Sequence, residues 1–479
     1  MQKITVKIFL TGISLFLSLS GYASQLTEVN SLKIASIFSD HMVLQQNCKV
    51  NLWGKAAPGK RLVVSGSWGK HASTKTGADG KWTVKLATPA AGGPYFVIIQ
   101  DGVVTIVIKD VLIGEVWLAS GQSNMDIPLS GWPPDNLILN SKQEISDAKY
   151  PTIRFMKVPF GISAKPRDAT GGEWIPLSPE TAGNVSATAY FFARKLQQEL
   201  NVPIGIVQSS IGGTPAEAWT SSRYLLKLGD FDNAIAEEND SAKLNSNSPT
   251  VLFNAMINPL VPYTIKGVIW YQGESNVGRA AQYKKLFPLL IADWRNQWGY
   301  VLPFYYVQIA PFLYSAPDQK EQSPKLRNAQ RFALKLAKTG MVSTLDIGYL
   351  KTAHPPNKQE VGNRLARFAL ANEYEKNVTV SGPLYQKTIV SGNTLIIKFK
   401  FVGSGLVAGA NGLNNFEMAS NDKIYVKADA QIIRNTVVVS SRLISNPLYV
   451  RYAWSDASCA TLFNKEGLPA ATFTSDDKN

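Results

Sequence analysis

Cysteine and long apolar runs are scarce in this chain of 479 residues. Its two cysteines, Cys48 and Cys459, lie near opposite ends, so a disulfide would need those ends to meet in space. Buried free cysteines are the alternative, and the sequence leaves both open. No apolar run reaches the about 20 residues of a membrane-spanning helix. No long Lys/Arg run or nucleic-acid-binding motif occurs, so no nucleic-acid partner is expected.

The first 24 residues are typical of a signal peptide. Lys3 and Lys7 give a positive start, the apolar stretch IFLTGISLFLSLS follows, and small residues precede Gln25. We therefore expect residues 1–24 to be removed and the mature protein to be periplasmic or secreted. Without Lys3 and Lys7 the formal charge falls from +14 to +12. This surplus fits either attraction to an anionic substrate or polysaccharide or a solubilising surface, and we favour the second because charge alone says nothing about fold or chemistry.

Hydrophobic residues make up 45% and charged residues 18%, which is the composition of a globular protein. A chain of 479 residues is long enough for two or three domains. Residues 25–110 read as short strands, with Asp79-Gly80 as a hairpin turn ahead of alternating Trp82, Val84 and Leu86. This predicts an N-terminal β-sandwich region. Residues 373–479 return to strand patterns and predict a C-terminal β region, which stands alone or packs with the N-terminal one.

Residues 111–372 alternate strand-like and helical stretches, which predicts an α/β domain with a parallel sheet. The apolar runs are VWLAS, IGIVQSS, GVIWYQ, FYYVQIA and MVSTL. Covering helices are predicted over 189–200 and 358–370, the second with Asn357 and Glu360 at capping-box positions.

Chemistry-bearing residues follow four of these runs. VWLAS leads into Ser123, IGIVQSS into Gly212-Gly213, GVIWYQ into Glu274, and MVSTL into Asp346 and then His354. Sites in open α/β sheets form beyond the carboxyl ends of the strands. A hydroxyl, a Gly pair, amides and a His are the parts of an acyl-transfer site.

Histidine scarcity points to the base. Of the three histidines, His41 and His71 lie in the N-terminal β region, which leaves His354 for the α/β domain. A serine nucleophile needs such a base at neutral pH. The G-x-S-x-G elbow of α/β-hydrolases is absent, which argues against that class. Ser123, between Gly, Gln and Asn, could also be a turn residue.

The ordered motifs GQSNM, SSIGGTPAEAW, WYQGESN and HPPNKQEVGNRLA resemble the bacterial sialate O-acetylesterase family of SGNH hydrolases and its acetylxylan-esterase relatives. The resemblance runs from about residue 33 to 473. It implies a flavodoxin-like three-layer hydrolase domain, flanked by β-sandwich-type regions, that works without a metal or other cofactor. The implied partner is an acetylated carbohydrate.

The resemblance also implies site roles. Ser123 matches the nucleophile and His354 the base, and the N–H groups of Ser123 and Gly213 match oxyanion donors. The third donor is a side-chain amide of the WYQGESN block, with Gln272 preferred over Asn276. Glu274 matches a residue that supports the site from behind, although a carboxylate bonded to turn N–H groups is an equal interpretation. Arg327 and Gln330, in KLRNAQ, match positions where the family often places polar residues near the site, and a plain helix surface is the favoured expectation for both.

One departure concerns the acid of the triad. Relatives often carry Asp two or three residues before the base, where this chain has Thr352 and Lys351. Asp346 is the nearest upstream acid and could fold back to His354, or it could cap a loop. A Ser–His dyad with a backbone carbonyl orienting the imidazole is the alternative.

Three functions follow from these observations. The first is a carbohydrate O-acetylesterase, with sialate as the favoured substrate. The second is the same chemistry on acetylxylan or another polysaccharide. The third, suggested by the missing Asp, is a carbohydrate-binding protein with a degenerate site.

Overall fold

The computed structural model describes residues 32–237, 243–313 and 321–476. The predicted signal peptide, residues 1–24, lies outside these ranges. Within the described residues, no helix is both long and apolar enough to cross a membrane.

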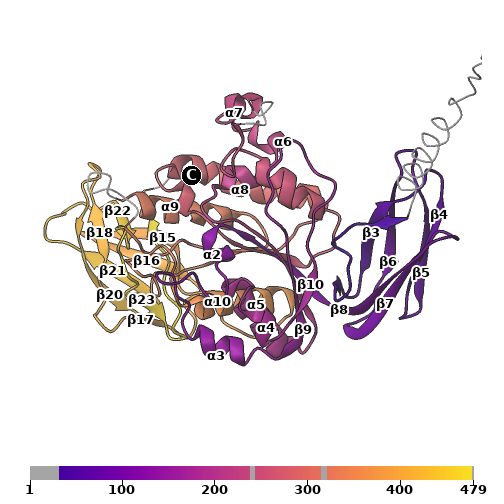
Figure 1. The fold of residues 1–479 in the computed structure, drawn as a ribbon. Helices are drawn as coiled ribbons and strands as arrows, with labels where there is room; N and C mark the ends of the chain where they lie inside the picture. Colours follow the sequence, from indigo (N-terminus) through magenta and orange to yellow (C-terminus); the bar gives the residue numbers. More distant parts are fainter. Residues whose placement is uncertain (1–31, 238–242, 314–320, 477–479) are drawn as a thin grey trace, which may run out of the picture.

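The N-terminal region consists of two facing sheets around a shared apolar core (Figure 1). The first sheet contains β1 (Lys33–Ile34), β3 (Lys49–Lys55) and β6 (Lys81–Ala87). The second contains β4 (Arg61–Gly66), β5 (Lys70–Lys75), β7 (Gly92–Gln100) and the start of β8 (Thr105–Gly121), with β2 (Val43–Gln45) also paired to β8. In β6 the side chains alternate between exposed and buried, as predicted.

Strand β8 is continuous from the N-terminal region into the central sheet. It pairs with β7 up to Ile113, with β11 from Glu115 to Gly121 and with β12 from Trp117 to Gly121. The predicted domain boundary at residue 110 therefore falls inside one strand. The central sheet has the order β10-β9-β11-β8-β12-β13-β14 and is parallel except for β10. Its further strands are β9 (Tyr150–Lys157), β10 (Trp174–Leu177), β11 (Ile204–Ser210), β12 (Gly267–Tyr271), β13 (Phe304–Val307) and β14 (Thr339–Val342).

Helices cover both faces of the central sheet (Figure 1). Trp117 and Ala119 of β8 pack in one core cluster with α5 (Ala187–Leu200) and α10 (Lys358–Glu373). Val116 and Leu118 point to the other face, where α8 (Ala280–Trp298) and α9 (Gln322–Arg331) lie. Strands buried on both faces explain the continuous apolar runs of the sequence. The predicted helices over 189–200 and 358–370 are confirmed, and the Asn357 side chain accepts from Glu360 N (3.1 Å) as predicted.

Shorter helices connect these elements. They are α2 (Ser123–Asp126), α3 (Ser141–Ser146), α4 (Pro179–Ala182), η1 (Ala216–Trp219), α6 (Ser222–Leu225), α7 (Asp232–Glu237), the π-helical η3 (Phe253–Ile257), η4 (Asn258–Leu260), η5 (Glu274–Asn276) and η6 (Phe332–Lys335).

The C-terminal region is built from small sheets around its own apolar core. One is β15-β16-β21-β20, another β19-β18-β22-β24, and β17 pairs with β23. Their bounds are β15 (Leu384–Ser391), β16 (Thr394–Lys400), β17 (Leu406–Ala408), β18 (Phe416–Ala419), β19 (Val426–Lys427), β20 (Asp429–Ile433), β21 (Thr436–Ser440), β22 (Tyr449–Tyr452), β23 (Leu462–Asn464) and β24 (Phe473–Thr474).

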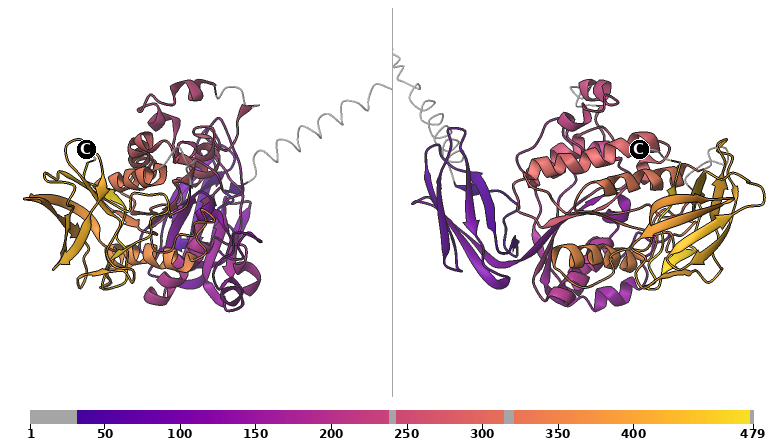
Figure 2. Two further views of the ribbon diagram at one scale, coloured as in Figure 1. Left: turned by 90° about the vertical axis from the view of Figure 1, so that its left-hand side faces the viewer. Right: turned by 180° about the vertical axis from the view of Figure 1, so that it is seen from behind.

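The two β regions lie at opposite ends of the molecule, with the central sheet between them (Figures 1 and 2). They do not form one module, which was one of the two arrangements the sequence left open. Cys48, in the N-terminal region, and Cys459, in the C-terminal region, are both free thiols.

Candidate active site

Ser123 lies at the first turn of α2, directly after the carboxyl end of β8. Later strands of the chain flank β8 on both sides, β11 on one and β12 on the other, so this end is a switch point of the sheet. Gly121 has a φ of +135°, and a Cβ there would lie 2.2 Å from Tyr271 O. Glycine is therefore required where β8 turns past β12 into α2. The Ser123 residue is 9% exposed.

Two backbone N–H groups are available beside Ser123. The N–H of Ser123 lies in the first turn of a helix, where intrahelical acceptors are lacking. Gly213 has a φ of +73°, and within the described residues its N–H has no protein acceptor. A Cβ on the adjacent Gly212 would lie 3.5 Å from Ser123 Cβ, which places this turn against the serine. The geometry suits a developing oxyanion at this point.

The Gln272 amide is not directed at Ser123. Its Nε2 donates to Thr214 O (3.3 Å) and to Asn276 Oδ1 (2.7 Å), and its Oε1 accepts from Tyr283 (3.1 Å). Both amide hydrogens thus have protein acceptors. Asn276 is equally buried, and its Nδ2 donates to Glu217 (2.9 Å). The two amides join the turn after β11 to the turn after β12.

Gln122 joins the serine turn to the same block. Its Oε1 accepts from the N–H groups of Gly273 and Ser275, both at 3.2 Å, and its Nε2 donates to Ser275 Oγ at 3.3 Å. The carboxyl ends of β8, β11 and β12 therefore form one hydrogen-bonded unit.

His354 is brought beside this unit by Asn124. The Asn124 Nδ2 donates to Ala353 O (2.9 Å), the carbonyl just before the histidine. The imidazole packs edge-on against Trp132, with ring centroids 5.6 Å apart. Burial, and then the positive charge of Lys358, lower the pKa of His354 from 6.5 to about 4. The imidazole is therefore neutral, as a general base requires, at pH 5 and above.

The group that holds the imidazole is Asn136. Nδ1 of His354 lies 2.9 Å from Asn136 Oδ1 and 3.4 Å from Thr352 Oγ1. Because a carbonyl oxygen only accepts, Nδ1 carries the hydrogen and Nε2 keeps its lone pair. Backbone hydrogen bonds between Trp132 and Asn136 (2.9 and 3.1 Å) close the turn that presents this amide. Thr352 adds a hydrogen bond to the same Oδ1 at 2.7 Å.

Asp346 does not contact His354, so the predicted third member of a triad is wrong. Both of its carboxylate oxygens accept from Arg364 of α10, at 2.7 and 2.6 Å. The Arg364 side chain is only 6% exposed, and a buried guanidinium needs a carboxylate close by. Asp346 thus serves the structure, which was the other interpretation of this residue.

A buried polar network lies behind Ser123. Asn124 Nδ2 donates to Glu274 Oε1 (2.6 Å), and Asn124 Oδ1 accepts from Lys358 Nζ. Burial raises the pKa of Glu274 and lowers that of Lys358 to about 7. Glu274 therefore bonds to a side-chain amide beside the serine.

Arg327 and Gln330 are fully buried, so their predicted place on a helix surface is wrong. Gln330 Nε2 donates to Gln272 O (3.2 Å) and supports the block after β12. Arg327 donates to Ser455 O (2.6 Å) and Thr472 Oγ1 (2.9 Å) of the C-terminal region.

Sequence reasoning missed three residues of this site: Asn124, Asn136 and Lys358. Lysine in the first turn of a helix opposes the helix dipole, so the position of Lys358 was a readable signal. Asn124 stood inside the GQSNM motif. Asn136 precedes its partner by 218 positions, and nothing in the sequence joins the two. Among the described residues, no group of three or more His, Cys, Asp or Glu could hold a metal ion.

Comparison with known proteins adds a consistent set of relatives. Residues 113–371 match the family model of carbohydrate esterases described as sialic acid-specific acetylesterases. The chain is 34% identical to human sialate O-acetylesterase over 395 residues, 74% of each chain. It is 29% identical to the mouse sialate O-acetylesterase over 513 residues, covering 92% of this chain and 94% of the relative. The crystal structure of a carbohydrate acetylesterase from Xanthomonas citri superposes with a TM-score of 0.84 at 35% identity, covering 93% of this chain and all of that one.

Proposed function

This chain belongs to the family of sialic acid-specific carbohydrate acetylesterases and is a carbohydrate O-acetylesterase, and from that premise we propose that Ser123 and His354 perform the hydrolysis. An enzyme of this family hydrolyses esters, so the interpretation as a degenerate binding protein is set aside. The observation that carries the proposal is the imidazole of His354, held through Nδ1 by Asn136 beside the turn that bears Ser123.

The proposed reaction is a two-step acyl transfer. Nε2 of His354 takes the proton of Ser123 as Oγ attacks the acetyl carbonyl, and the oxyanion lies between the N–H groups of Ser123 and Gly213. The sugar oxygen leaves with the proton from His354, and an acetyl ester on Ser123 remains. Water, deprotonated by His354, then releases acetate. Gln272 and Asn276 brace the Gly213 turn in this scheme.

Asn136 replaces the usual carboxylate of the triad. An asparagine performs the same orienting role in papain-like cysteine proteases. It selects the tautomer with a free Nε2 but contributes no negative charge to the imidazolium. This dyad with an amide orienter matches the low pKa of His354.

We propose acetylated sialate as the substrate, since the family model and the curated relatives carry that name. A cavity of about 580 Å³, lined by His354, Asn136 and Tyr349, is the proposed place of the sugar. We further propose a flavodoxin-like SGNH-type central domain, independence from metals, and export directed by residues 1–24. Acetate release from acetylated sialoglycan and from acetylxylan, compared at equal acetyl concentration, tests the substrate. Faster release from acetylxylan would assign the enzyme to plant polysaccharide instead.

The catalytic assignment is tested with p-nitrophenyl acetate. Ser123→Ala and His354→Ala should each lower kcat/KM by about 10⁴-fold or more. Ser120→Ala is the matched control, because the Ser120 hydroxyl is buried near the end of β8, three residues before Ser123, without a hydrogen-bond partner among the described residues. It should keep nearly full activity, and His71→Ala in β5 should do the same. Activity retained by Ser123→Ala would refute the assignment.

A further inference from the structure

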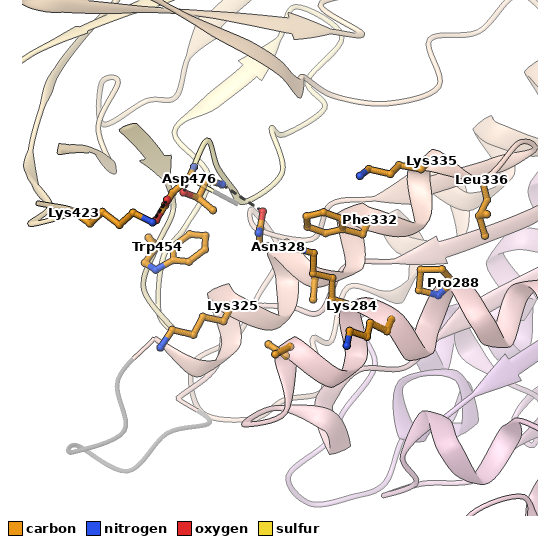
Figure 3. Close-up of a pocket in the computed structure, with 15 residues that line it drawn as sticks. Lys284, Pro288, Lys325, Asn328, Phe332, Lys335, Leu336, Lys423, Trp454 and Asp476 are labelled. Atoms are coloured by element: carbon orange, nitrogen blue, oxygen red, sulfur yellow. Dashed lines mark hydrogen bonds and ion pairs between the residues drawn. The ribbon is translucent and has the colours of Figure 1, made fainter. Parts of the chain in front are cut away.

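A large groove lies between the central domain and the C-terminal region (Figure 3). Its volume is about 980 Å³, and α8, α9 and η6 form one wall. Trp454, Thr474 and Asp476 of the C-terminal region contribute the other. Pockets of this size hold several sugar rings or one drug-sized ligand.

The charge of this groove is strongly one-sided. Its lining includes five lysines, Lys284, Lys285, Lys325, Lys335 and Lys423, and one carboxylate, Asp476. Asp476 pairs with Lys423 at 2.6 Å. Within the described ranges, no carboxylate pairs with Lys285 or Lys325, and both are exposed. A concave surface lined by one sign of charge concentrates ligands of the opposite sign.

Two of the lysines converge on a single aromatic ring. Lys284 Nζ from α8 lies 4.0 Å from the centroid of Phe332, and Lys335 Nζ from η6 lies 4.9 Å from it. Phe332 lies between these two lysines, and Pro288 and Leu336 add apolar surface to one side of them, as Figure 3 shows. Sugar rings present apolar C–H faces, so an anionic sugar matches both features.

The groove also begins near the catalytic block. Ala280, the first residue of α8, lines it and follows Asn276 of η5 by four residues, a reach of at most about 14 Å. Gln122 and Ser275 connect that block to the Ser123 turn. The groove therefore borders the helix that directly follows the catalytic block.

We propose that this groove is a second carbohydrate-binding site, which holds a carboxylate-bearing segment of the glycan while another residue of the chain is deacetylated. The inference rests on the proposed function only for the choice of sialate as the anionic sugar. Lysine fits this role because its ammonium is a point charge that accepts a carboxylate in many orientations.

The test is a binding measurement that needs no catalysis. A tetramer of sialic acid without acetyl groups is titrated calorimetrically into the full chain at low salt, with xylotetraose as the neutral probe. Lys285→Glu/Lys325→Glu should weaken sialate binding by about tenfold or more. Lys70→Glu/Lys75→Glu, on exposed positions of β5 at the far end of the molecule, changes the net charge equally and should bind as the wild type does.

Hydrolysis of p-nitrophenyl acetate by both double variants should stay within about twofold of wild type, because neither pair belongs to the site of Ser123 and His354 and the charges of exposed side chains are screened by solvent and salt. Retained hydrolysis shows that the variants are folded. It also makes the test of the groove independent of the roles assigned to Ser123 and His354. If both double variants lose sialate binding equally, the loss is an effect of net charge and the proposal is refuted. Equal binding of xylotetraose, or tighter binding of a single-stranded DNA of the same charge, would also overturn it.

Discussion

The imidazole of His354 is oriented by a neutral amide, and this affects how the site responds to pH. A carboxylate near Nδ1 would stabilise the imidazolium and raise the pKa, whereas Asn136 Oδ1 carries only a partial charge. Burial and Lys358 act in the opposite direction and lower the pKa to about 4. The base is therefore in its working form over a wide acidic range.

We predict that the acid limb of kcat/KM for p-nitrophenyl acetate lies near pH 4, well below the 6.5 of an unperturbed histidine. Asn136→Asp places a negative charge at Nδ1 and should move this limb up by at least about one pH unit. Asn136→Ala removes the orienting acceptor and should lower the plateau of kcat/KM by about tenfold or more. The measurement is a pH–rate profile of the three proteins.

An acid limb that stays in place in Asn136→Asp would mean that residue 136 does not face Nδ1. If the acid limb of the wild-type profile lies near pH 6.5, the imidazole of His354 is more exposed to water than it is in the structure.

At the scale of elements, α10 and the loop after β14 are held together by an ion pair. Arg364 donates to Ser343 O (2.9 Å) and to both oxygens of Asp346. The same helix begins with Lys358, whose ammonium contacts Asn124 beside the nucleophile. The helix thus connects a structural ion pair to the catalytic turn.

Asp346→Asn leaves the buried guanidinium of Arg364 without a counter-charge, and we expect the free energy of unfolding to fall by about 3–5 kcal/mol. Activity per folded molecule at 25 °C should stay within about threefold, because Asp346 does not touch His354. Urea unfolding and p-nitrophenyl acetate hydrolysis measure the two effects. Loss of kcat by several orders of magnitude with unchanged stability would restore Asp346 as a triad member.

At the scale of the whole molecule, the central sheet and the C-terminal region share buried polar contacts. Arg327 of α9 reaches Ser455 and Thr472, and Gln308 Oε1 accepts from Thr472 N at 3.3 Å. The N-terminal region is joined through the continuous strand β8. These connections favour cooperative unfolding of the central and C-terminal parts.

Arg327→Met keeps much of the side-chain volume but removes the donors to Ser455 and Thr472. We expect it to destabilise the protein by about 3 kcal/mol or more, since buried hydrogen bonds to a charged group are lost. Calorimetry should show a single lower transition for the central and C-terminal parts. A separate early transition of the C-terminal region alone would show that the two unfold independently.

The sequence alone determined the elements of this protein and the place of its chemistry. The apolar runs predicted β8, β11, β12, β13 and β14, and the Asn357 cap predicted the start of α10. Strand ends of a parallel sheet share one edge, so Ser123, Gly213 and the Gln272 block could be expected together. The family and its activity followed from motifs that lie at those ends.

Only the tertiary structure decided which side chains meet. The partner of His354 is Asn136 and not Asp346, because the buried Arg364 takes the carboxylate and the turn at Trp132 presents the amide. Packing of α9 between the central sheet and the C-terminal region placed both of its polar residues in the interior, where a helix surface was expected: Gln330 faces Gln272 and Val307, and Arg327 faces Ser455 and Thr472. Both outcomes depend on contacts between residues distant in the chain. Local periodicity specifies elements, whereas hydrogen bonds between distant residues are set by how the elements pack.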